Sequence, residues 1–265
     1  YLKMSLARRM YHRIKIAPKM VFRRADKIIT ISVSTSRDLV KTFKISPRKI
    51  KMIYMGVSEN FRVVRKDLAQ KMMEEKYGVK NYILYVGRNE PHKNIKALII
   101  AYKYLPDYLK EKYRLILVGK EDKKYAPALH DLVRKHGLSQ YVIFTGYVDE
   151  ADLPYIYSGA AVYVQPSFYE GFGLPILEAM ACGIPVVSSN SSSLPEVGSD
   201  AALYFDPYDV RKLAEHLTNI LDDEGLRKEM TEKGLKQVRN FSWFNSANSL
   251  LECFQELGGN NEKGK

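Results

Sequence analysis

Short apolar runs alternate with amphipathic stretches along the chain after residue 80. The runs predict short strands, and the first, over residues 81–86, has the unbroken apolar pattern of a strand buried on both faces. They cover residues 81–86, 113–118, 141–145, 160–165, 184–188 and 201–205. The stretches between them carry apolar residues three and four positions apart, which predicts helices. Strands separated by helices predict an α/β domain with a doubly wound, parallel, Rossmann-like sheet of about six strands.

Two proline positions predict where helices begin in this domain. Pro175 is placed as the first residue of a helix that follows a glycine-containing loop. Asp206 and Pro207 predict the N-cap and the first residue of another helix, because Asp accepts hydrogen bonds from backbone N–H groups and Pro tolerates the first turn. Residues 210–221 then place apolar side chains along one face of that helix.

The N-terminal part of the chain contains fewer elements than a complete parallel domain needs. Residues 1–24 predict a basic helix, 27–32 and 49–54 predict strands, and 34–43 predict a helix between these strands. We therefore expect residues 1–56 to be the trailing part of an incomplete second Rossmann-like domain, together with its linker.

The other boundaries follow from the same elements. Residues 57–241 are expected to form the complete domain, and residues 242–265 a last helix, capped by Ser242, with a frayed polar tail. The sequence opens on Tyr1 without an initiator methionine. We therefore expect a processed or truncated chain whose front part is missing.

Composition excludes several classes of protein. With 46% hydrophobic and 27% charged residues, the 265-residue chain is neither wholly disordered nor fibrous. No stretch approaches the roughly 18 apolar residues that a membrane-spanning helix needs. Cys182 and Cys253 are too few for a disulfide framework and suit a reducing compartment, which favours a cytoplasmic location.

The net charge of +12 is concentrated near the N-terminus. Residues 1–66 hold 18 Lys and Arg but 3 Asp and Glu, whereas the rest of the chain holds 24 and 27. Such an excess favours contact with an anionic partner, such as nucleic acid, lipid headgroups or phosphates. A solvated basic helix is the alternative, and the charge alone leaves both open.

The loop over residues 87–94, which follows the first strand of the domain, predicts a phosphate site. In open parallel sheets, ligands bind beyond the carboxyl ends of the strands. Arg88 and Lys93 lie five positions apart in this loop, which leads into the N-terminus of a helix. A guanidinium, an ammonium and helix N–H groups together suit a diphosphate. A solvated loop is the alternative, and this loop alone does not decide between them.

Residues 166–178 form a denser constellation. Gly171 and Gly173 precede the helix start and let backbone N–H groups approach an anion, with the positive end of the helix dipole behind them. Glu170 and Glu178 bracket this loop, and carboxylates accept hydrogen bonds from hydroxyls. A phosphate cradle between two hydroxyl acceptors predicts a sugar, a diphosphate and a ribose in series. A capping Glu170 and a surface Glu178 would leave the glycine spacing unexplained.

The stretch 170–178, EGFGLPILE, resembles the E-x7-E motif of the retaining glycosyltransferases of the GT-B fold, family 4, also called group 1. Other segments are similar to that family as well. They are residues 86–88 with 93–94, then 145–148, 178–185, 194–196 and 200–207, and residues 25–61 for the end of the N-terminal domain. The resemblance covers nearly the whole chain and implies the donor-binding domain of a GT-B enzyme.

The resemblance also implies roles for single residues. Glu170 would contact hydroxyls of the donor sugar near the reacting centre, and Glu178 would hold the nucleotide ribose. Arg88 and Lys93 would neutralise the diphosphate and help it leave, so these two and Glu170 are the expected catalytic residues. The other expected donor-binding residues are Gly171, Phe172, Gly173 and Leu174 around the diphosphate, Tyr147 and Val148 beside the base, and Gly119 where the nucleotide approaches.

No cofactor and no metal are expected. The sequence has no Asp-x-Asp pair and no His, Cys and Asp cluster with the spacing of metal ligands. Arg88 and Lys93 can stabilise the charge of the leaving diphosphate instead. The expected partners are a nucleotide-diphosphate sugar, a glycan or lipid-linked acceptor, and an anionic membrane surface reached through residues 1–66. Nucleic acid is not expected, and the location is cytoplasmic or peripheral at the cytoplasmic membrane face.

The glycine-rich loop and the histidine that the family carries on its acceptor side do not occur in this sequence. The chain is therefore expected to bind the donor and to transfer sugar poorly or not at all. Residues 188–207 resemble mannosyltransferases of polysaccharide assembly, which favours GDP-mannose as the donor. A GT-B epimerase or phosphorylase, and a non-catalytic nucleotide-binding or membrane-docking module, are the alternatives.

Overall fold

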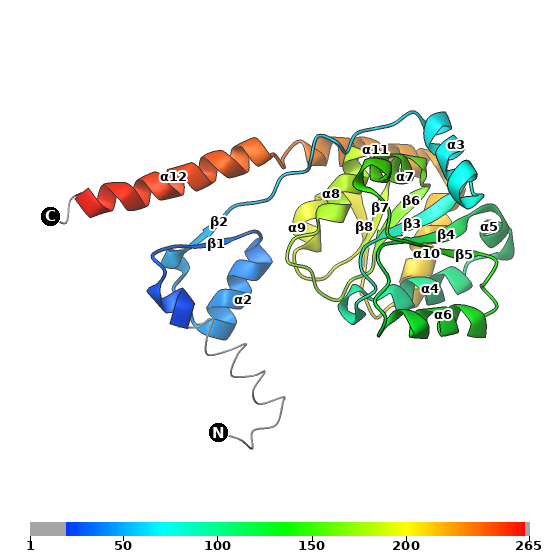
Figure 1. Ribbon diagram of the computed structural model, residues 1–265, viewed down its shortest axis with the longest axis horizontal. Coiled ribbons are helices and arrows are strands. Elements are labelled where there is room, and N and C mark those ends of the chain that lie inside the picture. The colour runs from blue at the N-terminus through cyan, green and yellow to red at the C-terminus, as the bar shows by residue number, and fades with distance from the viewer. Residues whose placement is uncertain (1–19, 263–265) are drawn as a thin grey trace, which may run out of the picture. The chain divides into compact units, whose positions relative to one another are not determined.

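The computed structural model describes residues 20–262 of the chain. These residues belong to two compact units (Figure 1). The larger unit comprises Val57–Ser242, and the smaller unit combines the chain up to Gly56 with the chain from Trp243 onward. The basic helix expected over residues 1–24 lies outside the described residues except for its last turn, where residues 20–24 are helical.

The larger unit is built on a six-stranded parallel sheet with the strand order β5-β4-β3-β6-β7-β8. Its strands are β3 (Tyr82–Val86), β4 (Arg114–Val118), β5 (Val142–Gly146), β6 (Val162–Gln165), β7 (Val186–Ser189) and β8 (Ala202–Phe205). All neighbouring strands run parallel. The six expected strands and the parallel α/β fold are therefore confirmed. From β3 the strand order runs outward to β4 and β5 on one side, and from β6 it runs outward to β7 and β8 on the other. The boundary between β3 and β6 is therefore the switch point of the fold.

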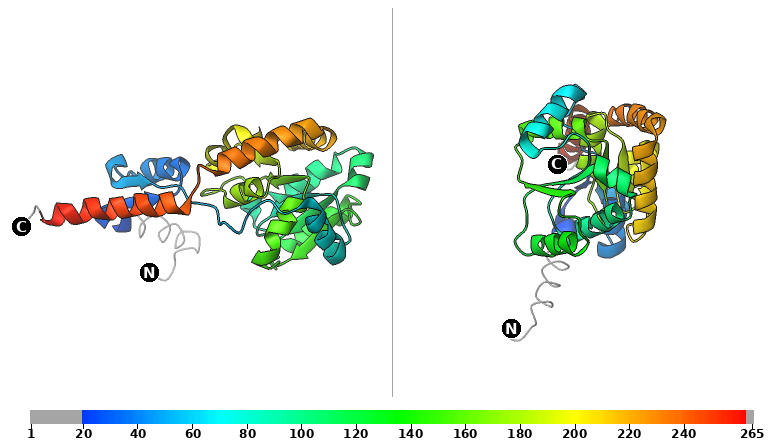
Figure 2. Two further views of the ribbon diagram at one scale, coloured as in Figure 1. Left: turned by 90° about the horizontal axis from the view of Figure 1, so that it is seen from above. Right: turned by 90° about the vertical axis from the view of Figure 1, so that its right-hand side faces the viewer.

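Helices cover both faces of this sheet (Figures 1 and 2). One layer contains α4 (Ile95–Lys103), α6 (Ala126–Lys135) and α10 (Val210–Asp222), with the short α5 (Asp107–Lys112) nearby. The other layer contains α3 (Lys66–Tyr77), α7 (Leu153–Gly159), α8 (Leu174–Ala181), α9 (Leu194–Gly198) and α11 (Glu224–Val238). Short 3-10 turns η1 (Pro47–Lys49), η2 (Pro91–Lys93), η3 (Glu150–Asp152) and η4 (Ser199–Ala201) connect elements of the chain.

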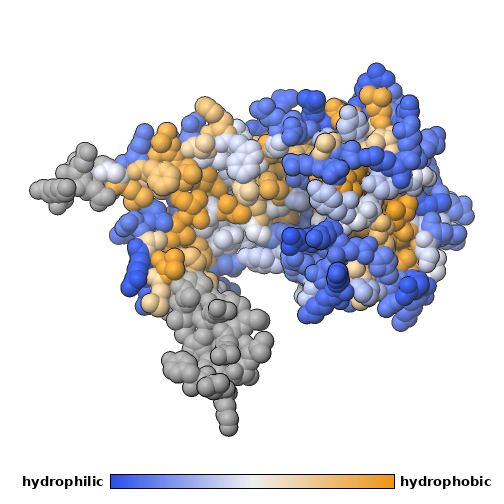
Figure 3. Space-filling view, viewed as in Figure 1, coloured by the Kyte–Doolittle hydropathy of each residue, from blue (hydrophilic) through white to orange (hydrophobic). Residues whose placement is uncertain are grey.

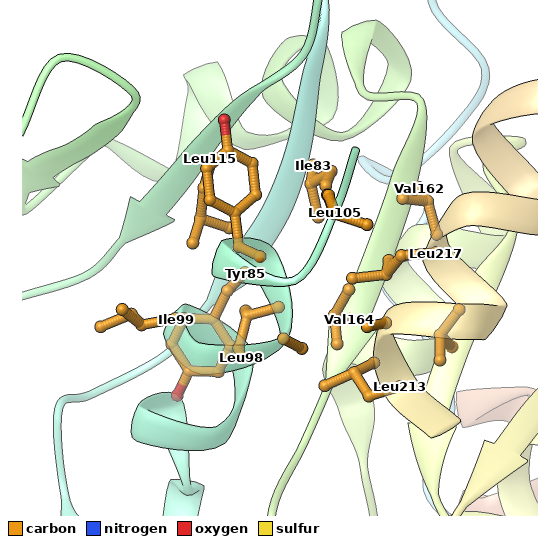
Figure 4. Close-up of a cluster of buried hydrophobic side chains, with 14 of the residues drawn as sticks. Ile83, Tyr85, Leu98, Ile99, Leu105, Leu115, Val162, Val164, Leu213 and Leu217 are labelled. Atoms are coloured by element: carbon orange, nitrogen blue, oxygen red, sulfur yellow. The ribbon is translucent and has the colours of Figure 1, made fainter. Parts of the chain in front are cut away.

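A large apolar core fills the space between the sheet and the layer that contains α4 and α10 (Figure 4). Alternate residues of the central strands point into it, among them Ile83 and Tyr85 of β3 and Val162 and Val164 of β6. The intervening residues of β3 are equally buried against the opposite layer. Burial on both faces explains why these strands are continuous apolar runs, since each fully buried aliphatic side chain contributes about 1.5–3 kcal/mol.

Two details of the helix starts differ from the expectation. The N-cap of α10 is Asp209, whose side chain accepts a hydrogen bond from the backbone N–H of Lys212. Asp206, which was expected to cap this helix, instead accepts from the N–H of Tyr208 at 2.9 Å and stabilises the preceding turn. Helix α8 begins at Leu174, so Pro175 is its second residue.

The smaller unit contains a parallel strand pair, β1 (Ile28–Thr30) and β2 (Ile50–Met52), connected through α2 (Val33–Phe43). Ser32 caps α2 by accepting from the N–H of Thr35. The last helix, α12 (Trp243–Glu262), belongs to the same unit and carries exposed apolar side chains (Figure 3). No helix within residues 20–262 has both the length and the apolar character needed to cross a membrane.

Candidate functional site

The carboxyl ends of β3 and β6 place the two predicted constellations side by side. These strands are neighbours at the switch point of the sheet. The loop over residues 87–94 follows β3, and the loop over residues 166–173 follows β6. The backbone N–H of Phe168 donates to the carbonyl of His92 at 2.8 Å, which joins the two loops directly. Ligands of doubly wound folds bind at this position.

Lys93 and Glu170 form an ion pair across these two loops. The Nζ of Lys93 lies 2.8 Å from Oε1 and 2.9 Å from Oε2 of Glu170. Both side chains are largely enclosed, with exposed fractions of 21% and 13%. A pair in such surroundings is screened less than a surface pair, so each charge is held by the other. The structure therefore brings an expected phosphate-binding cation and an expected sugar-binding carboxylate into direct contact.

The backbone on either side of Glu170 is tied to the segment that follows β7. The N–H of Glu170 donates to Oγ of Ser192 at 2.8 Å, and Ser192 adopts the left-handed conformation with φ 50°. The hydroxyl of Ser193 donates to the carbonyls of Glu170 and Phe172 at 3.0 and 2.7 Å. These hydrogen bonds hold the loop that precedes α8 against the segment that follows β7.

Asn94 joins three loops at this end of the sheet. Its side chain is buried, and its Nδ2 donates to the carbonyl of Pro166 at 3.0 Å and to that of Pro207 at 2.9 Å. Asn94 also ends the turn η2 and precedes α4 with φ 54°. Its amide thus connects the segments after β3, β6 and β8 with one side chain.

The glycine-containing loop runs directly into the N-terminus of α8. Gly173 precedes this helix with φ 119°, and a Cβ at this position would lie 2.9 Å from Cδ2 of Leu194. The backbone conformation therefore favours glycine strongly, and a side chain at this position would also have to displace the Leu194 methyl group. Gly171 is half-buried and Phe172 is buried, while Leu174 opens the helix. The positive end of the helix dipole thus faces the loop that was expected to cradle a diphosphate.

Glu178 lies within α8 and is supported differently from Glu170. It accepts a hydrogen bond from the hydroxyl of Tyr157 at 2.8 Å, and Tyr157 is fully buried. Burial raises the pKa of the Glu178 carboxyl above its ordinary value, and the Tyr157 bond offsets only part of this effect. The carboxyl is therefore an acceptor whose charge calls for further hydrogen-bond donors.

Arg88 occupies a different environment from Lys93. Its side chain is 76% exposed, and its NH1 lies 3.7 Å from Oε1 of Glu90. A surface pair at this distance contributes little energy, so the guanidinium can leave Glu90 at small cost. The two cations expected to act together are thus held in different ways, one enclosed and one extended into solvent.

The three remaining predicted residues follow β4 and β5. Gly119 has φ 140°, and a Cβ there would lie 2.1 Å from the carbonyl oxygen of Gly87. Glycine is needed at position 119 because two backbone segments approach closely there. The sequence indicated only an approach of the nucleotide at this position. Tyr147 is exposed and Val148 is half-buried beyond the end of β5.

Several polar residues of the site were missed from the sequence. Asn94, Gln165, Ser167, Ser192 and Ser193 all bind the loops or the carboxylate of Glu170. The serine-rich stretch over residues 188–193, which begins within β7 and continues beyond its end, was the available signal for Ser192 and Ser193. Within residues 20–262, no group of three or more His, Cys, Asp or Glu side chains is placed to hold a metal ion.

A parallel Rossmann-like unit with this pair of loops at its switch point is the architecture expected for one domain of a GT-B fold. The model of the family "Glycosyl transferases group 1" matches residues 68–237. The chain belongs to this family, and this confirms the resemblance to the group 1 glycosyltransferases.

Similar proteins agree with this assignment. O-antigen chain mannosyltransferase B of Escherichia coli is 38% identical over 238 residues, covering 88% of this chain and 61% of that protein. O-antigen chain mannosyltransferase RfbU of Salmonella typhimurium is 34% identical over 217 residues, covering 82% and 56%. The serotype-specific mannosyltransferase WbdA of Escherichia coli is 36% identical, and the matched region is 29% of its length. The chain thus spans less than two thirds of these relatives.

Solved structures show the same fold. Sucrose-phosphate synthase from Thermosynechococcus elongatus superposes with a TM-score of 0.83 at 28% identity, covering 94% of this chain and 62% of that one. HepE from Anabaena in a complex with UDP and glucose superposes with a TM-score of 0.84 at 21% identity, covering 92% and 66%. These similarities confirm the expected GT-B fold.

Proposed function

We propose that this chain is the donor-binding part of a retaining, metal-independent glycosyltransferase that uses a nucleotide-diphosphate sugar. The enclosed Lys93–Glu170 pair, placed between the β3 loop and the N-terminus of α8, carries the proposal. It puts a phosphate-binding cation and a hydroxyl-binding carboxylate within one hydrogen bond of each other. A sugar phosphate has the two complementary groups side by side, namely an anion for the cation and hydroxyl donors for the carboxylate.

Each charged group has a distinct part in this proposal. Glu170 accepts hydrogen bonds from hydroxyls of the donor sugar, and Glu178 accepts from the ribose. Lys93 shares its ammonium between Glu170 and the diphosphate, and Arg88 moves from Glu90 to the phosphates. The departing diphosphate gains negative charge as its bond to the sugar breaks. The two cations and the dipole of α8 stabilise that charge without a metal ion.

Mannose is the proposed sugar and GDP-mannose the proposed donor. The mannosyltransferase names of the relatives at 34–38% identity support this choice. The O-antigen names of two of them support a glycan or lipid-linked acceptor. The basic N-terminal part of the chain supports a location at an anionic, cytoplasmic membrane face.

The isolated 265-residue chain is proposed to bind donor and to transfer little or no sugar. It spans 61% of the length of mannosyltransferase B, and the family resemblance implies that the acceptor side belongs to the other domain of the GT-B fold. A rapid sugar transfer by this chain alone would contradict the proposal.

Calorimetric titration with GDP, UDP and ADP, each with and without its sugar, tests the donor site. Arg88→Ala and Glu178→Ala are expected to weaken nucleotide binding by roughly tenfold or more, as for loss of a charge-assisted bond. Arg65→Ala and Glu75→Ala are matched controls, since these charged residues lie exposed on or next to α3. Binding should persist in EDTA. No binding of any nucleotide, or equal binding by all variants, would contradict the proposed function.

A further inference from the structure

A series of buried, hydrogen-bonded polar side chains leads to Glu170. Tyr163 and Gln165 lie on β6, and Ser167 follows two residues later. Their exposed fractions are 0%, 1% and 0%. Buried polar groups of this kind are retained where their hydrogen bonds are satisfied, and here each side chain has its partner in the next one.

The hydrogen bonds of this series all run toward Glu170. The hydroxyl of Tyr163 donates to the amide oxygen of Gln165. The amide Nε2 of Gln165 donates to Oγ of Ser167 at 2.7 Å and to Oε1 of Glu170 at 2.8 Å. The hydroxyl of Ser167 donates to the same Oε1 at 2.7 Å. Turning the Gln165 amide by 180° would set its oxygen against the carboxylate, so the carboxylate of Glu170 defines the amide orientation and the Tyr163 hydroxyl holds the amide oxygen on the opposite side.

The two carboxylate oxygens of Glu170 are thereby made unequal. Oε1 accepts from Lys93, Gln165 and Ser167, all within 2.8 Å. Among the described residues, Oε2 has Lys93 as its hydrogen-bond partner, at 2.9 Å. A carboxylate oxygen that already accepts three bonds has little capacity for another, whereas Oε2 retains a free lone pair.

We propose that Gln165 is a positioning residue of the donor site. With Tyr163 and Ser167 it fixes Oε1 of Glu170, and this leaves Oε2 to accept from a hydroxyl of the donor sugar. The inference rests on the proposed function, because it assumes that Glu170 faces the sugar while the nucleotide is held elsewhere. Gln165 acts on the sugar only through Glu170.

The consequence is a selective loss of sugar recognition when the chain of hydrogen bonds is broken. Gln165→Met keeps the side-chain length and removes both amide donors. Tyr163→Phe keeps the ring and removes the hydrogen bond that holds the amide oxygen of Gln165. Both variants let Glu170 leave its position, while Arg88 and Glu178 remain to bind the nucleotide. A misplacement of this kind weakens the contacts of one group by roughly tenfold or more.

The test measures dissociation constants for GDP and GDP-mannose, with UDP and UDP-glucose as a second pair, on the 265-residue chain and its variants. Gln165→Met is expected to raise the constant for the nucleotide sugar about tenfold and that for the free nucleotide less than about twofold. Tyr163→Phe should shift the same constant in the same direction by a smaller factor. Tyr82→Phe is the matched control, since its hydroxyl is equally buried and donates to the carbonyl of Ile156.

Three results would overturn the inference. An equal rise in both constants would show that Gln165 only supports the fold, and unchanged constants would show that it positions nothing. Equal affinity of the unsubstituted chain for the nucleotide and the nucleotide sugar would show that Glu170 gains no binding energy from the sugar. Absence of all binding would refute the proposed function itself. If Gln165→Met does not fold, Ser167→Ala, which removes one donor to Glu170, replaces it beside Tyr163→Phe.

Discussion

Replacing Asn94 tests how the candidate site is assembled. Asn94 donates two buried hydrogen bonds from one nitrogen, to the carbonyls of Pro166 and Pro207, and holds φ at 54°. Asn94→Ala removes both bonds and places a Cβ-bearing residue without a polar side chain in the left-handed region. The segments after β3, β6 and β8 lose their common connection.

The expected loss of stability follows from these contacts. Each buried hydrogen bond that is removed costs about 1–1.5 kcal/mol, because its carbonyl is left without a partner. The left-handed conformation adds about 1 kcal/mol for alanine. Asn94→Ala is therefore expected to lower the free energy of unfolding by about 3–4 kcal/mol. Asn94→Gly tolerates the backbone conformation and should lose about 2–3 kcal/mol through the bonds alone.

Urea and thermal unfolding measure these differences. For a unit of this size, the Asn94→Ala change corresponds to a fall in Tm of roughly 6–16 °C. Asn81→Ala is the matched control, because Asn81 precedes β3 with an exposed side chain and should change the unfolding energy by less than about 0.5 kcal/mol. A loss below about 1 kcal/mol for Asn94→Ala, or identical losses for Ala and Gly, would refute the reasoning.

Two further substitutions follow from the same geometry. Gly119→Ala would bring a Cβ to 2.1 Å from the Gly87 carbonyl oxygen and should lower the free energy of unfolding, measured with denaturant, by about 4 kcal/mol or more. Gly137→Ala is the control, because a Cβ there meets open space, and it should cost about 1 kcal/mol. Equal costs for the two variants would contradict the close approach of the two backbone segments. The raised pKa of Glu178 means that the folded state holds its proton more tightly, so its contribution to stability falls as pH rises above the ordinary value of 4.5. Glu178→Gln should therefore increase the unfolding energy near pH 7, with a gain that shrinks toward pH 4.5, and a gain independent of pH would contradict this.

The strands of the larger unit were predictable because burial on both faces leaves a plain signal. The central strands β3 and β4 consist almost entirely of apolar residues, and parallel pairing follows from the helices between the runs. Helices with little buried surface left no such signal. Along α3 only Ala69 and Met73 are buried, and along α11 only Met230 and Gly234. Their positions depend on tertiary packing, which the local pattern does not contain.

The Asp206 error has a local physical cause. Asp206 and Asp209 lie three positions apart, and either can accept from a backbone N–H group ahead of α10. Aspartate stabilises turns and helix starts through the same interaction, so the sequence offers two equivalent solutions. The turn around Pro207 takes the first and the helix takes the second.

The candidate site was predictable as a set of chemical groups and not as a set of contacts. Arg88 and Lys93 carry the same charge in the same loop, yet Lys93 is enclosed against Glu170 and Arg88 extends toward solvent. This difference arises because β6, which is far away in sequence, is the neighbour of β3. The strand order thus decides which cation meets the carboxylate, and no local pattern encodes it.

The two glutamates that bracket the α8 loop are supported in opposite ways. Glu170 receives donors from Lys93, Gln165 and Ser167, so its position is defined before a ligand arrives. Glu178 is enclosed with one hydroxyl donor, and burial raises its pKa. Hydroxyls of a bound ribose would supply the donors that this carboxylate needs and would stabilise its charge. Under the proposed function, the Glu170 end of the loop is prearranged for the donor sugar, and the Glu178 end gains its full stabilisation only when the nucleotide binds.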